Sequence, residues 1–477
     1  MREDLHQASE VVVHLYRFKD LNIILDVNSG AVHTASDPVF DILSFCGGAL
    51  FSNERLARTF DTLSKKYSLE VLSEAMHEIS ELTAAGMLFT PDPTEDEITP
   101  EGRGAVIKAM CLHAAHDCNM RCSYCFADTG GFSGERGLMP LKTGQKAIDF
   151  LLDQSGSRTN LEIDFFGGEP LMNFEVIKEL VLYGRKCEKE YGKHIRFTLT
   201  TNGLLLDEEK TAFINEHVDN VILSIDGRPE INDRMRKTVN GEGTYGLIID
   251  KLLTFVKSRK ANKPADGNSP RGRQYYVRGT FTAYNKNFTE DVLHLAELGF
   301  ANISIEPAVT DKDEPWALTE SDLPELFAEY DRLADIIIES GKTGEPVSFF
   351  HFKVNLEQGP CVFKRASGCG AGTAYVAVTP EGDIYPCHQF AGEPEYKLGN
   401  VNDDSFNNRL FSDFEKAHIF SKNECRNCWA KYYCSGGCHA NALHFSGSLY
   451  EPHRLSCELE KKRLECAIGL AVKSSGF

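Results

Sequence analysis

An α/β fold built around a parallel sheet, flanked in the sequence by two smaller units, is predicted by three observations. Short apolar strands alternate with helical segments from about residue 105 to 310. The 15 cysteines fall mainly into two groups, one at 118–125 and one from 361 to 457. A length of 477 residues exceeds one ordinary core, so several domains are expected.

The overall composition favours a cytoplasmic protein that binds neither nucleic acid nor membrane. A net charge of −19 lacks the basic footprint that nucleic-acid binders carry. No run approaches the ~20 apolar residues that span a bilayer, and the opening "MREDLHQASE" lacks the apolar core of a secretory signal. In a reducing compartment, grouped cysteines bind metal more often than they form disulfides, so metal centres are expected.

Residues 1–92 are predicted to form a separate module that is similar to a winged helix. The stretch "NIILDVNSGAVHTAS" at 22–36 has the pattern of two short strands around a turn. Asp37-Pro38 then starts a helix. A longer helix is capped by Ser68, and its apolar face is predicted to comprise Leu69, Leu72, Met76, Ile79 and Leu82.

A proline-rich, acidic linker at 93–104 leads into the alternating region at 105–310. Six strands separated by helices predict a parallel sheet that is either doubly wound or curled into part of a barrel. A polar stretch at 257–274 falls in a helix-to-strand connection, and we expect it to be a tolerated insertion. The strands are expected at 106–115, 161–166, 195–200, 220–226, 275–282 and 301–306.

Two segments complete the chain. Residues 311–350 are predicted to form one acidic amphipathic helix with flanking loops, a helical bridge with no assigned chemistry. Residues 351–477 have few periodic segments and many Cys, Gly and aromatic residues. Such a segment can do without an extensive apolar core if metal centres hold it together.

A loop after the first strand of the alternating region holds three cysteines and no fourth. Cys118, Cys122 and Cys125 are spaced CxxxCxxC within "HDCNMRCSYCF". A closed structural zinc site and a four-iron cluster held wholly by protein each take four ligands. Three thiolates therefore leave one position open to another ligand. A zinc site completed by a distant ligand, such as His116, is the alternative.

Polar groups and glycines also follow several of the expected strands. Tyr124, beside the last cysteine of the loop, is placed to stack on a flat ring. The next strand ends in "FFGGEP", in which two glycines let the backbone approach closely and Glu169 offers a carboxylate. Later strands end in "TTNG" at 200–203 and "SIDG" at 224–227. Each is singly an ordinary strand-to-helix turn, but together they predict a composite site on one face of a barrel.

These motifs resemble those of the radical S-adenosylmethionine (SAM) enzymes, which implies a partial (β/α)6 TIM barrel. The resemblance implies that Cys118, Cys122 and Cys125 hold a [4Fe-4S] cluster whose open iron is chelated by SAM. The fourth thiol is then absent so that the cofactor can bind. The SAM-binding residues implied are Tyr124; Gly167, Gly168 and Glu169 for the amino group; Thr200 and Asn202 in the pocket; Ser224 and Asp226 near the ribose; and Arg236 or Arg278 for the carboxylate. No further catalytic residue is assigned.

The C-terminal cysteines form a second series. The spacing CxxC followed by two more cysteines would also suit a zinc ribbon. The complete series is similar to the SPASM domain of peptide-modifying radical SAM enzymes, which implies two auxiliary [4Fe-4S] clusters. The resemblance gives an outer cluster to Cys425, Cys428, Cys434 and Cys457, and an inner cluster to Cys369, Cys387 and Cys438.

Cys361 is the candidate fourth ligand of the inner cluster. With it the cluster is closed and serves electron transfer only; without it an open iron would be available to a substrate thiolate. The remaining cysteines lie in apolar or helical contexts and are predicted to be ordinary buried or surface residues. They are Cys46, Cys111, Cys187 and Cys466.

The N-terminal module is similar in size and order to the domains that recognise the leader of a ribosomally made precursor peptide by strand addition. Its opening most resembles the maturases of the six-cysteines-in-forty-five (SCIFF) and ranthipeptide group. That resemblance implies thioether crosslinks from Cys sulfur to a non-α carbon of an acceptor residue, made through a 5′-deoxyadenosyl radical. The implied partners are a cysteine-rich precursor peptide with its leader and a flavodoxin- or ferredoxin-type reductant.

Two other kinds of function remain open from the sequence. The same machinery would also serve a carbon–carbon crosslink, formylglycine formation or epimerisation. A non-catalytic iron–sulfur or zinc scaffold, or an electron carrier, would explain the cysteines alone. Against the scaffold stand the open position of the three-cysteine loop and the GGEP segment on the neighbouring strand.

Overall fold

The computed structural model describes residues 13–48, 53–92, 106–132, 134–261, 274–344, 346–356, 366–403 and 405–475. The chain divides into two compact units. The barrel unit comprises Gly104–Phe350 and Cys369–Lys416, and the terminal unit comprises Met1–Arg103, His351–Gly368 and Ala417–Phe477. The predicted linker at 93–104, most of the insertion at 257–274, and Cys361 lie outside the described residues. The domain boundaries given above remain predictions.

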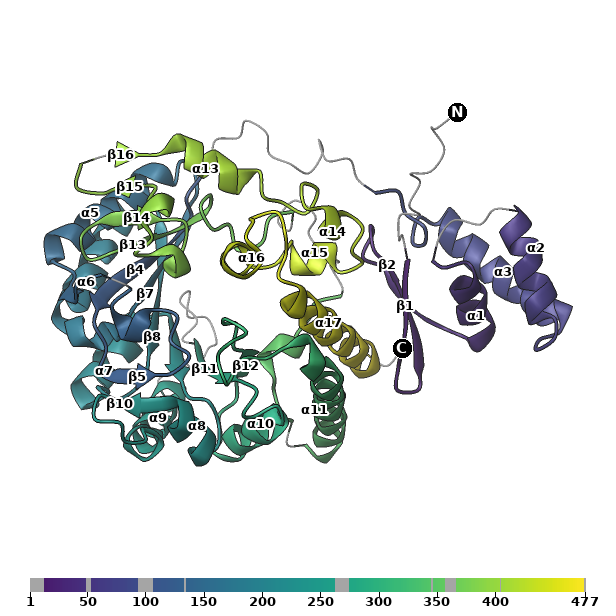
Figure 1. The fold of residues 1–477 in the computed structure, drawn as a ribbon, viewed down its shortest axis with the longest axis horizontal. Coiled ribbons are helices and arrows are strands. Elements are labelled where there is room, and N and C mark those ends of the chain that lie inside the picture. The colour runs from purple at the N-terminus through teal and green to yellow at the C-terminus, as the bar shows by residue number, and fades with distance from the viewer. Residues whose placement is uncertain are drawn as a thin grey trace. The chain divides into compact units, whose positions relative to one another are not determined.

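The barrel unit is built on a parallel sheet that follows the predicted alternation (Figure 1). Neighbouring strands in the series β4, β7, β8, β9, β11, β12 are all parallel. Among the described strands, β4 and β12 do not pair with each other, so the series is open. The predicted α/β partial barrel is confirmed. The strands are β4 (Ala109–His116), β7 (Asn160–Gly167), β8 (His194–Thr201), β9 (Asn220–Ser224), β11 (Gln274–Phe281) and β12 (Ile303–Pro307).

Helices cover the outer face of this sheet, and along β7, β8, β9 and β11 buried residues alternate with less buried ones. Phe165 on β7 stacks on Phe197 on β8, with ring centroids 5.6 Å apart. The ring of Phe197 also packs against Gly184 of α6. Side chains one residue away, such as Asp164 and Phe166, therefore face the inner side of the barrel. The helices of this unit are α5 (Leu141–Gln154), α6 (Phe174–Tyr191), α7 (Glu208–His217), α8 (Pro229–Met235), α9 (Tyr245–Ala261), α10 (Phe288–Glu297), α11 (Leu323–Thr343) and α13 (Asn408–Glu415).

The sheet extends beyond β4 in a way that the sequence did not predict. β13 (Tyr375–Val378), from the cysteine-rich region, pairs in parallel with β4. The antiparallel strands β14 (Asp383–Tyr385), β15 (Gly399–Asn400) and β16 (Ser405–Phe406) follow it. These strands are too short to carry a recognisable alternation, so only their pairing within the sheet reveals them. The predicted helix of the 311–350 bridge is α11.

The N-terminal part of the terminal unit is a three-stranded antiparallel sheet with three helices. β1 (Val13–Phe18), β2 (Leu21–Asp26) and β3 (Val32–Ala35) pair in sequence order, so the predicted hairpin has an additional first strand. The helices are α1 (Asp37–Phe45), α2 (Asn53–Leu63) and α3 (Leu69–Ala84). Ser68 caps α3 as predicted, because its hydroxyl accepts from the Val71 amide at 3.3 Å. The predicted apolar face was wrong at Leu69, which is 69% exposed at the start of the helix.

The C-terminal part of the terminal unit packs on β1. The Tyr16 hydroxyl donates to the carbonyl of Glu465 at 3.1 Å, and the His14 ring stacks on Trp429 with centroids 3.9 Å apart. Asp92 accepts from Lys431 at 2.7 Å and from the Tyr432 hydroxyl at 2.8 Å. These contacts tie the N-terminal module to α15 (Lys431–Cys434) and α17 (Arg454–Ser474). The other helices of the C-terminal part are α14 (Asn423–Arg426) and α16 (His439–Ser446).

The packing of α17 on β1 depends on the absence of a side chain at Gly469. A Cβ there would lie 2.3 Å from Cγ of Phe18. We expect Gly469→Ala to lower the free energy of unfolding by about 1–3 kcal/mol through overpacking, measured as a fall in Tm. Gly246→Ala is the matched control, because Gly246 is exposed on α9 and a Cβ added there would have no atom within 4 Å. That control is expected to gain up to about 1 kcal/mol in helix propensity. An unchanged Tm for Gly469→Ala would contradict the packing described.

Candidate functional site

The three-cysteine loop is held beside the ends of two strands of the barrel unit. It contains β5 (Met120–Cys122), which pairs antiparallel with β10 (Arg236–Thr238), so that Arg236 lies opposite Cys122. The three thiols are half-buried. The Cys118 sulfur accepts from the Met120 amide at 3.4 Å and from the Asn202 side-chain amide at 3.7 Å.

The surroundings of these thiols suit a metal cluster better than free thiols. Burial raises the pKa of Cys118 to about 12, and the negative charge of Glu169 adds to this effect. Burial also raises the pKa of Cys122 to about 11, although the Arg236 charge opposes it. Without a cation the thiols of Cys118 and Cys122 stay protonated, whereas a coordinated thiol is deprotonated outright. The donor set of three neighbouring sulfurs therefore fits the predicted cluster.

The segment Gly167-Gly168-Glu169, called the GGE segment below, lies directly against the start of this loop. The Gly168 amide donates to the Ala115 carbonyl at 2.8 Å, and the Glu169 amide donates to the Asp117 carbonyl at 2.8 Å. A Cβ on Gly168 would lie 2.1 Å from the Asp117 oxygen. Glycine at 168 is therefore required for the backbone to come this close.

The Glu169 carboxyl is buried and fixed by three donors. It accepts from the amides of Leu171 (3.0 Å) and Asn202 (2.8 Å), and from the hydroxyl of Thr201 (2.8 Å). Burial raises its pKa to about 7, and the three hydrogen bonds oppose the rise. Thr201, which the sequence analysis did not single out, makes this contact. Thr200 faces the opposite side of β8, and its place in the SAM pocket stays a prediction.

Three predicted cofactor residues come together at the end of β9. The Tyr124 hydroxyl donates to the Asp226 carboxylate at 2.7 and 2.8 Å, and Arg236 donates to the Tyr124 oxygen at 3.0 Å. All three groups are thus held beside the cysteine loop. The predicted stacking of Tyr124 on a ligand is not tested by these contacts.

The two candidate arginines differ in their surroundings. Arg236 is 6% exposed, and its Nε is buried with no hydrogen-bond partner among the described residues. Arg278 is half-exposed and forms an ion pair with Glu306. It lies opposite the predicted Ser224 on the neighbouring strand. Of the two, Arg236 is the one beside the three-cysteine loop.

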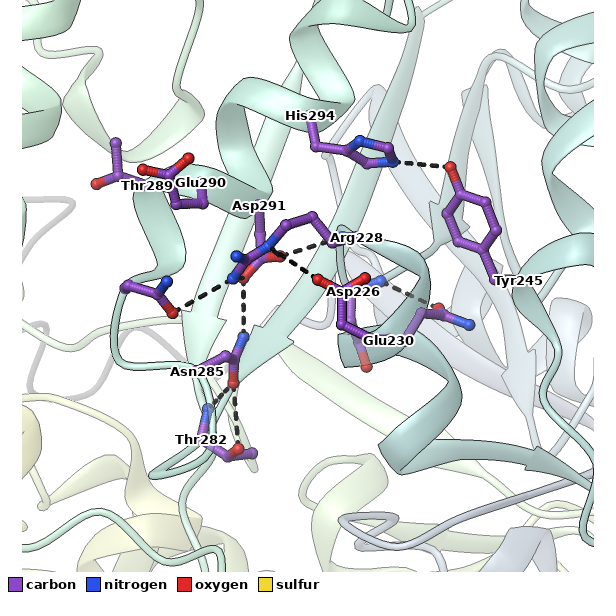
Figure 2. Close-up of polar contacts among 12 residues, drawn as sticks. Asp226, Arg228, Glu230, Tyr245, Thr282, Asn285, Thr289, Glu290, Asp291 and His294 are labelled. Atoms are coloured by element: carbon purple, nitrogen blue, oxygen red, sulfur yellow. Dashed lines mark hydrogen bonds and ion pairs between the residues drawn. The ribbon is translucent and has the colours of Figure 1, made fainter.

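A buried network behind Asp226 was missed by the sequence reasoning. Asp291 on α10 is fully buried and accepts from Nε of Arg228 at 2.8 Å, from the Arg228 amide at 3.1 Å and from Asn285 at 3.1 Å. Figure 2 shows Asp291 at the centre of these contacts. The network fixes the turn that follows Asp226 and so holds that carboxylate in place. No spacing in the sequence links Asp291 to the SIDG motif.

A second missed residue, Asp164, lies on the inner face of the sheet. It is opposite Cys111 on one neighbouring strand and Thr198 on the other. Its Oδ1 is buried, and no hydrogen-bond partner for it lies in the part of the chain that the structure describes. Burial raises the pKa of Asp164 to about 7, although the charge of Arg278 opposes the rise.

The four cysteines assigned to the outer cluster surround one cavity of about 270 Å³ in the terminal unit. Burial raises the pKa of Cys425, Cys434 and Cys457 to about 12 in each case. Among the described residues, no group of three or more His, Cys, Asp and Glu side chains is arranged to hold one metal ion. The cavity is lined by Glu424, Cys425, Cys428, Ala430, Lys431, Cys434, Gly436, Pro452, Arg454, Cys457, Glu458, Glu460 and Lys461.

The inner-cluster ligands remain predictions. Cys369 is exposed and Cys387 is buried in the barrel unit, whereas the exposed Cys438 belongs to the terminal unit. Cys361 lies outside the described residues. The other four cysteines are buried, as predicted: Cys46, Cys111, Cys187 and Cys466. Within the described ranges, no helix is both long and apolar enough to cross a membrane.

The raised pKa of Asp164 predicts a pH-dependent cost to stability. The folded chain keeps the Asp164 proton up to about pH 7, whereas the unfolded chain loses it near pH 4, so stability falls as the pH rises between these values. We expect the Tm difference between Asp164→Asn and the parent to grow in favour of the variant from pH 5 to 7 and to level off above pH 8. Each pH unit below 7 is worth about 1.4 kcal/mol. Glu297→Gln, at an exposed site on α10, is the control; an equal trend in both variants would contradict the assignment.

Comparisons with known proteins agree with this geometry. Residues 101–248 match a 4Fe-4S single cluster domain, and residues 369–429 match SPASM, an iron–sulfur cluster-binding domain. The chain is 25% identical over 346 residues to the cysteine-type anaerobic sulfatase-maturating enzyme of Clostridium perfringens, covering 68% of this chain and 86% of that protein. It is 24% identical to the radical SAM cyclopropyl synthase TigE of Paramaledivibacter caminithermalis, covering 75% and 73%.

A solved structure extends the likeness to nearly the whole chain. SuiB of Streptococcus suis bound to S-adenosylmethionine has a TM-score of 0.51 at 15% identity and covers 94% of this chain and 99% of its own. The same protein bound to its precursor peptide SuiA matches with a TM-score of 0.50. The chain thus contains two regions that match iron–sulfur cluster-binding domains, it is similar in sequence to a sulfatase-maturating enzyme and a radical SAM cyclopropyl synthase, and it shares the fold of SuiB.

Proposed function

We propose that this protein is a radical SAM maturase that installs thioether crosslinks in a cysteine-rich, ribosomally made precursor peptide. The single observation that carries the radical SAM part is the three-thiol loop held against the GGE segment, with Glu169 and Asn202 beside Cys118. The sequence resemblance to the ranthipeptide maturases supports the thioether part. The proposed location is the cytoplasm, where thiols are kept reduced, and the proposed electron donor is of flavodoxin or ferredoxin type.

Each group at the site has a proposed role toward the cofactor. When bound, SAM and a reduced cluster would supply a 5′-deoxyadenosyl radical as the species that abstracts hydrogen from the peptide. Cys118, Cys122 and Cys125 ligate the cluster. Glu169, already oriented by three donors, accepts hydrogen bonds from the SAM amino group.

Two further groups complete the proposed SAM site. Arg236 has a buried, unpartnered Nε and would meet the SAM carboxylate. Asp226 would bind the ribose, and its orientation is fixed by Tyr124 and by the Thr280 amide at 3.1 Å. The buried arrangement of these residues would also exclude water from the reacting groups.

The N-terminal module is proposed to bind the leader along β3. β1 carries the contacts to Glu465 and Trp429, so that edge is covered within the terminal unit. Among the described strands, β3 pairs only with β2. Apolar surface lies next to β3, because His33 hydrogen-bonds the carbonyl of Met87, whose side chain is 41% exposed. An extended leader would add to this edge as a fourth strand.

A second outcome has support from a relative. The Clostridium perfringens protein is a cysteine-type sulfatase-maturating enzyme, which favours formylglycine formation as the competing product. Carbon–carbon crosslinking and epimerisation would use the same site, and the mass of the product peptide distinguishes them from thioether formation. An iron–sulfur or zinc scaffold without catalysis would form no 5′-deoxyadenosine.

The first experiment incubates anaerobically reconstituted protein with SAM, dithionite and a candidate cysteine-rich precursor. We expect 5′-deoxyadenosine and a peptide that has lost two hydrogens per crosslink, with the linked thiols no longer alkylated, by mass spectrometry. Cys122→Ala is expected to abolish 5′-deoxyadenosine because it removes a cluster ligand. Cys187→Ala, in a helix outside the site, should retain it. If 5′-deoxyadenosine forms but the peptide thiols stay free, the product contains another kind of bond. If fully iron-loaded protein forms no 5′-deoxyadenosine, the enzyme assignment is overturned.

The leader site is tested by removing one outward amide from β3. The Asp26 amide donates to the Ala31 carbonyl, and alternation along the ladder then directs the Val32 and Thr34 amides away from β2. Thr34→Pro therefore removes a donor from the open edge and leaves the β2 ladder intact. We expect at least tenfold weaker leader binding by fluorescence anisotropy, with SAM cleavage in the absence of peptide unchanged. Thr34→Val keeps the amide and is the control; equal affinity in all three proteins would exclude β3.

A further inference from the structure

A lysine is buried behind the wall of the four-cysteine cavity. Lys422 is 1% exposed, and its Nζ donates to the carbonyl of Gly436 at 2.8 Å. Gly436 lines the cavity. The Lys422 carbonyl in turn accepts from the amide of Cys425 at 3.0 Å, so both ends of the residue are attached to the cavity wall.

Lys422 lacks the carboxylate partner, among the described residues, that the other lysines near the cavity have. Lys431 pairs with Asp92 at 2.7 Å, and Lys461 pairs with Glu458 at 2.8 Å. No ion pair joins Lys422 to a carboxylate among the described residues. The negative groups that would act on its ammonium are instead cysteine sulfurs, once a bound cluster ionises them: those of Cys425, Cys434, Cys438 and Cys457.

This placement has an electrostatic consequence for a cluster in the cavity. An isolated buried ammonium is strongly unfavourable, so the ionised sulfurs around the cavity are what compensates its charge. A four-iron cluster on four thiolates is itself negative, and it becomes more negative on reduction. A positive charge in a low-dielectric region stabilises the reduced form more than the oxidised form, and cluster potentials respond to net charge and solvent exposure.

We propose that Lys422 is a positioning residue whose buried ammonium raises the reduction potential of the cluster held by Cys425, Cys428, Cys434 and Cys457. This favours electron transfer to that cluster rather than from it. The inference rests on the proposed function only in that it requires a cluster at these four cysteines. According to this inference, the charge that sets the reduction potential of this cluster is the buried ammonium of Lys422, next to Gly436.

The test is a potentiometric titration monitored by electron paramagnetic resonance. The full chain carries Cys118→Ala, Cys122→Ala and Cys125→Ala, so that only auxiliary clusters contribute, and Cys457→Ala identifies the signal of the outer cluster. In Lys422→Met we expect at least a tenfold change in the ratio of oxidised to reduced cluster at fixed potential. For a one-electron couple this is a shift of about 59 mV toward more negative values.

Three further variants separate charge from structure. Lys422→Gln keeps a donor for the Gly436 carbonyl without the charge and should shift as Lys422→Met does. Lys422→Arg keeps the charge and should retain the parent midpoint. Lys473→Met is the matched control: Lys473 pairs with Asp20 and lies 16 residues from Cys457 along α17, which is about 24 Å at helical rise. Its midpoint should equal that of the parent.

The outcomes distinguish this inference from the proposed function. An unchanged midpoint in an iron-loaded Lys422→Met protein, or a shift in Lys422→Met but not in Lys422→Gln, overturns the inference and leaves the function standing. If both neutral variants fail to load the outer cluster while Lys422→Arg loads it, the role is structural and the inference is also overturned. If Cys457→Ala removes no signal that the parent shows, the assignment of a cluster to these four cysteines is wrong, and the inference is wrong with it.

Discussion

The approach of the GGE backbone to the residues between β4 and the cysteine loop is the contact on which the candidate site depends. Two amide-to-carbonyl hydrogen bonds join Gly168 and Glu169 to Ala115 and Asp117, at a separation that excludes a Cβ at position 168. The contact places Glu169 next to Cys118, and Glu169 then fixes Asn202 through its carboxylate. Three consecutive strand ends are thereby set relative to one another before any cofactor binds.

Burial of ionisable groups is the second constraint, and the two units meet it differently. In the barrel unit, Asp226 and Arg236 bracket the Tyr124 hydroxyl, so charge is balanced by side chains of opposite sign. In the terminal unit, the buried Lys422 faces sulfur atoms instead. Burial lowers the pKa of this lysine, and the cysteine charges oppose the change. The ionisation of the ligands and of Lys422 is therefore coupled through the cavity wall.

Much of the barrel unit was predictable because its strands, helices and motifs are each encoded by residues that are close together in the sequence. Six strands with their helices follow from periodicity, and the motifs at their ends name Glu169, Asn202 and Asp226 directly. Asp291 was not predictable, since it lies 65 residues beyond Asp226 in the sequence and meets Arg228 only through tertiary packing. Asp164 sits inside an apolar strand segment, where a single acid gives no sign of which face it occupies. The exposure of Leu69 shows the same limit, because the first turn of a helix lies beyond the packed face.

The terminal unit is assembled from segments at opposite ends of the chain. Its strand β1 is covered by residues around 429 and 465, so more than four hundred residues separate partners that touch. Ribosomes release roughly 5–20 residues each second, so β1 waits at least about twenty seconds in the cell before its partner helix exists. During that interval its apolar side chains stay available to chaperones or to other nascent chains. Every pause in translation between β1 and α17 lengthens the exposure, so the yield of folded protein is tied to the speed of synthesis over nearly the whole message.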